Sequence, residues 1–278
     1  MAQDWQEGVG ADTQSGSPLS FAVAEADRQI LDMVRDGLRR RRVALAYQPV
    51  ALAADVGQVA FYEGLIRILD ESGRIIPARD FIGAVETTEL GRLIDCAALE
   101  LGLETLFREP GLRLSVNMSA RSIGYARWMD TLQRGLAAHQ TVAERLILEI
   151  TEGSAMLMPE LVTSFMDDLH RRGICFALDD FGAGFTAFRY LRDFCFDLVK
   201  IDGQFIRDIH RNPDNQVMTR ALMAIARQFD MFTVAEAVET AEEAEWLRAA
   251  GVECLQGYLF GAPTTHPAWT TPAARRTA

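Results

Sequence analysis

Residues 174–184 read ICFALDDFGAG, a short apolar run that ends in two adjacent aspartates and a glycine-rich turn. The apolar run at residues 174–178 predicts a buried strand, and residues 181–184 predict the break that ends it. Successive side chains of a strand point to opposite faces, so Asp179 and Asp180 can share a site only where the strand is ending. The stretch therefore predicts a strand that delivers polar side chains at its carboxyl end.

Seven further apolar runs of this kind lie along the chain. They cover residues 43–47, 59–66, 112–116, 146–150, 196–199, 232–235 and 254–260. All connections but the first are at least 15 residues long, which is enough for a helical crossover between parallel strands. The first connection, residues 50–58, is too short for one, so strands one and two are predicted to form an antiparallel hairpin. Eight such units in about 220 residues predict a TIM-like (β/α)8 barrel of the α/β class.

The sequence around the eight runs predicts the domain organisation. We expect a flexible N-terminal tail over residues 1–20, a single barrel domain over residues 21–264 and a C-terminal tail over residues 265–278. Apolar residues at helical spacing predict an N-terminal helix over residues 21–42, which we expect to cover the last strand. Four consecutive arginines end this helix. We interpret them as a solvated helix end favoured by the helix dipole, with a nucleotide or membrane patch as the alternative.

Composition and charge exclude several classes of function. The chain has 278 residues with 28 basic and 39 acidic side chains, and the net charge of −11 repels polyanions, so long nucleic acid is not an expected partner. No stretch approaches the roughly 18 apolar residues of a membrane span, and the first residues lack the apolar core of a signal peptide. The four cysteines lack CxxC spacing and require no disulfide scaffold. We expect a cytoplasmic protein.

Polar residues stand at or just after nearly every predicted strand. In chain order they are Glu63 and Arg67, Asn117, Glu149, Asp179 and Asp180, Lys200 and Asp202, Glu236 and Glu239, and Gln256. Barrel enzymes carry their active residues at the carboxyl ends of the strands, so we expect these side chains to converge on one mouth. Any one of them has a structural explanation, such as a helix cap or a solvated carboxylate. Their repetition on successive strands favours a functional site.

Carboxylates crowded at one mouth require a cation. Two of them 4 Å apart repel by about 1 to 4 kcal/mol, and summed over pairs this rivals the stability of a domain. Oxygen ligands suit Mg²⁺ or Mn²⁺, and the set available is Glu63, Asn117, Glu149, Asp179, Asp180 and Glu236. Asp179 could bridge two metals about 3.5 to 4 Å apart, the spacing used on phosphoesters. Lys200 would orient or deprotonate the attacking water, and Arg67 would hold a phosphate.

Seven motifs resemble, in order, those of the EAL domain family. They are Glu63-Gly64-Leu65-Ile66-Arg67, Ser115-Val116-Asn117-Met118-Ser119, Glu149-Ile150-Thr151-Glu152, Asp179-Asp180-Phe181-Gly182, Lys200-Ile201-Asp202, Ala235-Glu236-Ala237-Val238-Glu239 and Gln256-Gly257-Tyr258-Leu259-Phe260. The resemblance runs from about Tyr47 to Pro263. It implies a bacterial signalling enzyme, a phosphodiesterase that hydrolyses cyclic di-GMP to linear pGpG with two Mg²⁺ or Mn²⁺ ions. It also implies a barrel whose first strand is antiparallel.

The resemblance assigns roles to individual residues. It implies that Glu63, Lys200 and Glu236 are catalytic and that the six oxygen donors given above are the metal ligands. It implies substrate contacts or supporting site residues at Gln48, Arg67, Asp202, Glu239 and Gln256. It also implies that Glu152 supports the loop that follows the fifth strand. We also expect a homodimer, and control through a regulatory protein partner is a further expectation.

Three departures from the family pattern leave alternatives open. Gly64 replaces the alanine of the naming motif, Ala237 replaces a glycine, and residues 185–187 read Phe-Thr-Ala where Tyr, Ser and Ser are usual. The altered loop bears on how metal binding is coupled to dimerisation, and it motivates a receptor that binds cyclic di-GMP without hydrolysing it. A glycoside hydrolase that uses two barrel carboxylates is a third alternative. It leaves Asn117, Lys200 and Arg67 without roles.

Overall fold

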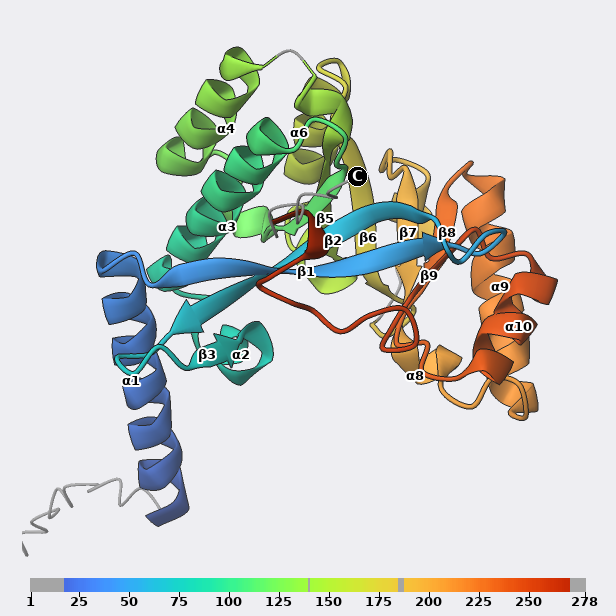
Figure 1. The fold of residues 1–278 in the computed structure, drawn as a ribbon, viewed down its shortest axis with the longest axis horizontal. Helices are drawn as coiled ribbons and strands as arrows, with labels where there is room; N and C mark the ends of the chain where they lie inside the picture. The colour runs from blue at the N-terminus through green and yellow to red at the C-terminus, as the bar shows by residue number, and fades with distance from the viewer. Residues whose placement is uncertain (1–17, 140, 185–187, 271–278) are drawn as a thin grey trace, which may run out of the picture.

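The computed structural model describes residues 18–139, 141–184 and 188–270, so the altered loop at residues 185–187 and most of the predicted N-terminal tail lie outside the described residues. Within the described part, nine strands form one sheet, and eight of them close into a barrel in the order β1-β9-β8-β7-β6-β5-β4-β2, with β1 returning to β2 (Figure 1). The strands are β1 (Val43–Leu52), β2 (Val59–Leu69), β3 (Ile75–Pro77), β4 (Leu114–Asn117), β5 (Leu146–Thr151), β6 (Cys175–Phe181), β7 (Leu198–Ile201), β8 (Phe232–Ala235) and β9 (Cys254–Gln256). The predicted α/β barrel is confirmed.

The first strand is antiparallel to both of its neighbours, as its short connection predicts. Strand β1 pairs antiparallel with β2, with Gln48 opposite Glu63, and antiparallel with β9, with Val50 opposite Gln256. The pairs from β2 to β4 and onward through β9 are parallel. The β1–β2 hairpin therefore closes the barrel. The sequence reading missed β3, a three-residue strand on the outer edge of β2.

Helices alternate with the parallel strands and surround the barrel (Figure 1). They are α1 (Pro18–Arg39), α2 (Ile82–Val85), α3 (Glu89–Arg108), α4 (Ala126–Ala138), α5 (Glu152–Ala155), α6 (Pro159–His170), α7 (Phe188–Leu191), α8 (Gly203–Ile206), α9 (Pro213–Gln228) and α10 (Ala241–Ala250). Side-chain caps start several of them. Thr88 accepts from the Leu90 amide, and Thr240 forms a capping box with Glu243. No helix in the described ranges combines the length and the apolar composition needed to cross a bilayer.

The N-terminal helix does not cover the last strand, so that prediction was wrong. Helix α1 packs against α2, α3 and β2, far from β9 along the β1–β2 ribbon (Figure 1). A Cβ added at Gly37 would lie 2.7 Å from Ile68 Cγ2, which shows how closely the helix backbone approaches β2. The outer side of the hairpin is covered by the segment after β9, where the Trp269 ring packs against Tyr47 and Tyr62 at centroid distances of 5.3 and 4.4 Å.

The barrel interior holds a layer of small and medium apolar side chains. Its members are Val50, Phe61, Ile147, Ala177, Val234 and Cys254, with Leu198 packed against them. A much larger apolar cluster lies between the strands and the helices that cover them. This interior layer fills the middle of the barrel and forms the apolar floor beneath the side chains at the carboxyl ends of the parallel strands.

Candidate functional site

The candidate site is the next layer of side chains above this apolar floor. Alternate residues of a strand face the same side, so the next inward-facing residue toward the mouth lies two positions from each floor residue, after it on the parallel strands and before it on the antiparallel β1. Those positions are polar: Gln48 from β1, Glu63 from β2, Glu149 from β5, Asp179 from β6, Lys200 from β7, Glu236 after β8 and Gln256 from β9. The alternation of apolar and polar residues along each strand thus brings together residues that are far apart in the sequence.

Asp180 joins this layer through a local irregularity rather than through the end of the strand. Strand β6 continues to Phe181, but its register with β7 shifts between Leu178 and Phe181. Asp180 adopts a left-handed backbone with φ of 56°, which is uncommon outside glycine. A bulge of this kind re-aims side chains. The predicted break at residues 181–184 was therefore misplaced, and the turn that brings Asp180 beside Asp179 occurs at Asp180 itself.

Lys200 lies at the centre of the layer. Its side chain is 1% exposed, and Nζ lies 2.8 Å from Glu236, 2.9 Å from Glu149, 3.1 Å from Asp179 and 3.2 Å from Glu63. These carboxylates hold the pKa of Lys200 well above its usual value, although burial alone would lower it. In the protein alone, Lys200 is therefore an ammonium ion that donates hydrogen bonds.

Glu63 is the best satisfied of the carboxylates. Oε1 accepts from Asn117 Nδ2 at 2.8 Å, and Oε2 accepts from Gln256 Nε2 at 2.6 Å and from Lys200. Burial alone would raise the pKa of Glu63, but Lys200 and the two amide donors outweigh it and hold that pKa below its usual value. Because the side-chain nitrogen of Asn117 faces Glu63, the side-chain oxygen Oδ1 of Asn117 is the atom left for another partner.

The other carboxylates are held against their preference for water. Burial, with the nearby charge of Glu63 as a second cause, raises the pKa of Glu149 to about 8. Burial and the adjacent Asp179 raise the pKa of Asp180 to about 6, and burial raises that of Glu236 well above its usual value. Without another cation, the layer relieves its excess negative charge by binding protons.

The donor set fits divalent cations. Four carboxylates contact the Lys200 ammonium, and Asp180 adds a fifth beside Asp179 and Glu236. This leaves four negative charges when all are ionised, and two divalent ions carry a matching positive charge. Asp179, Asp180 and Glu236 each offer an oxygen, and these oxygens lie within 4.8 Å of one another. Glu149 Oε1 is buried without a hydrogen-bond partner, as expected of an oxygen available to a ligand. Oxygen donors of this kind suit Mg²⁺ or Mn²⁺.

A pocket of about 400 Å³ opens above the layer. Among the predicted site residues, it is lined by Gln48, Glu63, Asp179, Asp180, Lys200, Glu236, Glu239 and Gln256. Gln48 is also tied to the layer, since its Oε1 accepts from Gln256 Nε2 at 3.3 Å. The sequence reading missed Leu65, Gly203, Ala237, Gly257 and Tyr258, which also line this pocket. Each of these five lies one or two residues from a predicted site residue, which is the signal that could have identified them.

Five predicted site residues lie outside the pocket lining, and two of them, Asn117 and Glu149, belong to the layer beneath it through their contacts with Glu63 and Lys200. Arg67 is buried and its guanidinium donates to the Ile66 carbonyl at 2.9 Å. Asp202 caps α8 by accepting from the Gln204 amide at 2.7 Å. Glu152, at the start of α5, accepts from the Gly182 amide at 3.1 Å, so it contacts the chain directly after β6.

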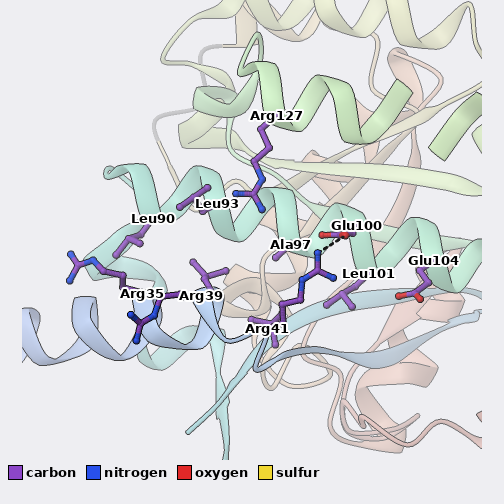
Figure 2. Close-up of a pocket in the computed structure, with 12 residues that line it drawn as sticks. Arg35, Arg39, Arg41, Leu90, Leu93, Ala97, Glu100, Leu101, Glu104 and Arg127 are labelled. Atoms are coloured by element: carbon purple, nitrogen blue, oxygen red, sulfur yellow. Dashed lines mark ion pairs between the residues drawn. The ribbon is translucent and has the colours of Figure 1, made fainter. Parts of the chain in front are cut away.

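The four-arginine cluster lies elsewhere, and two of its members, Arg39 and Arg41, line a groove between α1 and α3 (Figure 2). Arg39 and Arg40 bind Asp36 at 2.9 and 2.8 Å, and Arg42 binds the same carboxylate. Arg41 forms an ion pair with Glu100 on α3 at 3.6 Å (Figure 2). Because each of these arginines already has a carboxylate of the same protein as a partner, the geometry favours the helix-end interpretation over an anion-binding patch.

Comparisons with known proteins agree with this geometry. The family model described as "EAL domain" matches residues 31–263. The bifunctional diguanylate cyclase/cyclic di-GMP phosphodiesterase MucR of Pseudomonas aeruginosa is 30% identical over 247 residues, and the alignment covers 87% of this chain and 36% of MucR. The cyclic di-GMP phosphodiesterase NbdA of the same organism is 31% identical over 245 residues, covering 86% of this chain and 31% of NbdA. The chain thus spans about a third of the length of these relatives.

Solved structures give the same result at the level of the fold. A structure titled "PaMucR Phosphodiesterase, c-di-GMP complex" superposes with a TM-score of 0.74 at 30% identity, covering 87% of this chain and 99% of that one. The EAL domain of FimX from Pseudomonas aeruginosa, bound to c-di-GMP, superposes with a TM-score of 0.77 at 24% identity, covering 85% and 96%. The FimX likeness concerns the fold alone.

Proposed function

Because the chain belongs to the EAL domain family, we propose that it is a metal-dependent phosphodiesterase that hydrolyses cyclic di-GMP to linear pGpG. The observation that carries the proposal is the layer in which four carboxylates contact the buried Lys200 and Asp180 lies beside them as a fifth. Relatives named as cyclic di-GMP phosphodiesterases, and a related structure titled as a phosphodiesterase in complex with c-di-GMP, support the choice of substrate.

Two divalent cations, Mg²⁺ or Mn²⁺, are part of the proposal. The side chains that would hold them are Glu63, Asn117, Glu149, Asp179, Asp180 and Glu236. When bound, such ions polarise a phosphodiester and lower the pKa of water. The oxygen-only donor set and the unpartnered Glu149 Oε1 support this assignment.

The protein's own residues would supply orientation and charge. Lys200 donates hydrogen bonds, so of its two predicted roles we favour orientation of the attacking water over its deprotonation. Gln256 and Asn117 hold Glu63 in place through hydrogen bonds of 2.6 and 2.8 Å. Gln48 and Glu239 line the pocket mouth and would contact substrate. The buried Arg67 would offer a phosphate the guanidinium N–H groups that its bond to the Ile66 carbonyl does not use.

The wider setting of this activity is also a proposal. Residues 21–264 would form the catalytic unit, acting in the bacterial cytoplasm as a homodimer, with a regulatory protein as a further partner. The substrate is a bacterial second messenger according to the family resemblance, and this motivates the cytoplasmic assignment.

A turnover assay tests the proposal. We expect purified protein with Mn²⁺ to convert cyclic di-GMP to pGpG, measured by chromatography, and to lose this activity on chelation. Glu63→Gln keeps the side-chain volume but removes a charge from the layer, and we expect turnover to fall by about a thousandfold. Glu245→Gln, on the exposed surface of α10, is the matched control with unchanged turnover.

The competing hypothesis is a receptor that binds cyclic di-GMP without hydrolysis. A wild-type protein that binds the dinucleotide stoichiometrically, yet leaves it intact after hours with Mn²⁺, would favour the receptor. Turnover that persists after complete metal removal would contradict the metal-dependent mechanism.

A further inference from the structure

A buried carboxylate outside the candidate site has no role in the chemistry described above. Asp95 lies on α3, is 8% exposed, and burial raises the pKa of its carboxyl to about 7. Burying a carboxylate is unfavourable unless hydrogen bonds compensate for the lost hydration. Such a residue in a helix that covers a barrel calls for an explanation, because local rules are most often broken where function requires it.

Asp95 holds the turn that directly follows Asn117. Its Oδ2 accepts from the Ser119 amide at 2.9 Å and from the Ser122 hydroxyl at 2.6 Å. Asn117 is the last residue of β4, and the chain leaves the strand through this turn. The carboxylate therefore fixes the backbone two residues after a proposed metal ligand.

Ser154 connects the same turn to α5. Its hydroxyl accepts from the Ala120 amide at 2.8 Å and lies 3.4 Å from the Ser119 hydroxyl. Helix α5 begins with Glu152, which binds the Gly182 amide in the loop after Asp179 and Asp180. Hydrogen bonds thus link Asp95, the β4 turn and α5, and α5 in turn contacts the β6 loop.

We propose that Asp95 is a positioning residue that sets the orientation of Asn117 through the Ser119–Ser122 turn, with Ser154 joining that turn to the Glu152 loop anchor. The role in cation binding rests on the proposed function, whereas the ordering of the turn does not. Groups that orient metal ligands typically change metal affinity by about 10- to 100-fold when they are removed.

Four substitutions distinguish the hydrogen bonds that Asp95 accepts from its negative charge and from a general loss of protein stability. Asp95→Ala removes the acceptor for both hydrogen bonds. Asp95→Asn keeps an oxygen that can accept them while removing the charge. Ser154→Ala removes the hydrogen bonds between the turn and α5 and leaves those of Asp95 in place. Thr105→Ala is the matched control. Thr105 lies on the same helix as Asp95, about 15 Å further along, and its hydroxyl bonds to Tyr47 of β1. The substitution removes that hydrogen bond and leaves the turn intact.

Two measurements on the whole protein test the proposal. Mn²⁺ affinity, measured by electron paramagnetic resonance, is expected to fall at least tenfold in Asp95→Ala and to stay within twofold of wild type in Asp95→Asn and Thr105→Ala. Hydrogen exchange without metal is expected to accelerate at least tenfold over residues 117–123 in Asp95→Ala. In Ser154→Ala the acceleration is expected at residue 120, while residues 203–206 stay unchanged in every variant.

The outcomes separate this inference from the proposed function. Unchanged exchange over residues 117–123 in Asp95→Ala would overturn it, and so would Asp95→Asn behaving like Asp95→Ala. Equal losses of Mn²⁺ affinity in Thr105→Ala and Asp95→Ala would also overturn it, because they would indicate a general effect of stability. A wild-type protein that binds no Mn²⁺ would contradict the proposed cofactor and the metal-binding part of the inference, and the exchange comparison would still decide the role of Asp95 in the turn. If Asp95→Ala does not fold, the same exchange test applies to Ser122→Ala, which removes one of the two bonds to Asp95.

Discussion

Lys200 shows how the charge of a single side chain organises the site. It contacts four carboxylates and is almost completely buried. Removing one partner of a buried ionic network leaves uncompensated charge and typically costs about 3 to 5 kcal/mol. We expect Lys200→Met to lower the free energy of unfolding by about 3 kcal/mol at pH 7.5 without metal, measured by urea denaturation.

Divalent cations should reduce this loss, because they neutralise the same carboxylates. The prediction is that saturating Mn²⁺ stabilises Lys200→Met by more than it stabilises wild type, while turnover stays at least about a hundredfold below wild type. Equal stabilisation of the two proteins by Mn²⁺ would show that Lys200 and the cations do not share ligands.

Asp95 gives a pH dependence with a definite sign. Its pKa is raised from about 3.9 unfolded to about 7 folded, so its contribution to stability is full below pH 3.9 and is lost as pH rises toward 7. The folded pKa lies about 1.5 pH units above pH 5.5, so the contribution still present at pH 5.5 and lost by pH 8.5 is about 2 kcal/mol of the free energy of unfolding. We therefore expect wild type to lose about 2 kcal/mol relative to Asp95→Asn over this range. Parallel stability curves for the two proteins in urea titrations would contradict the assignment.

At the scale of the element, two neighbouring loops are fitted to each other. Ala237, after β8, adopts a left-handed backbone with φ of 51°, and a Cβ added at Gly203 after β7 would lie 2.6 Å from the Ala237 Cβ. A non-glycine residue in this conformation carries about 1 kcal/mol of strain or more. The alanine at this position, noted in the sequence as a departure from the family, is thus accommodated by the glycine opposite it.

A double-mutant cycle tests this fit. Ala237→Gly is expected to raise the free energy of unfolding by about 1 kcal/mol, because the strain is relieved. Gly203→Ala is expected to lower it by about 2 kcal/mol through the steric clash, and the double variant should recover most of that loss. Strictly additive effects in chemical denaturation would show that the two loops do not contact each other.

The sequence could predict the strand ends but not their local geometry. The apolar run before Asp179 predicted β6, yet the bulge at Asp180 depends on the register with β7, a contact between distant parts of the chain. The contacts of Arg67 and Asp202 could not be predicted from the sequence either. Their residue types suit phosphate binding and site support, but their described contacts are a backbone carbonyl and a helix cap.

At the scale of the whole molecule, the barrel follows from spacing. Long connections predicted parallel strands, and the short connection before Gln58 predicted the antiparallel hairpin that closes the barrel. The same regularity, a polar residue two positions from an apolar floor residue, brings polar side chains from six strands and from the residue after β8 into one layer. The position of α1 could not be predicted this way, because its apolar face fits many surfaces and the packing against α3 and β2 is decided by shape.

The central claim is that this acidic layer is a centre for two divalent cations. Anomalous diffraction from crystals soaked in Mn²⁺ tests it most directly. We predict two peaks in contact with oxygens of Glu63, Asn117, Glu149, Asp179, Asp180 and Glu236, with Lys200 displaced from at least one carboxylate. A layer without anomalous peaks, in which Lys200 still contacts all four carboxylates at saturating Mn²⁺, would contradict the account.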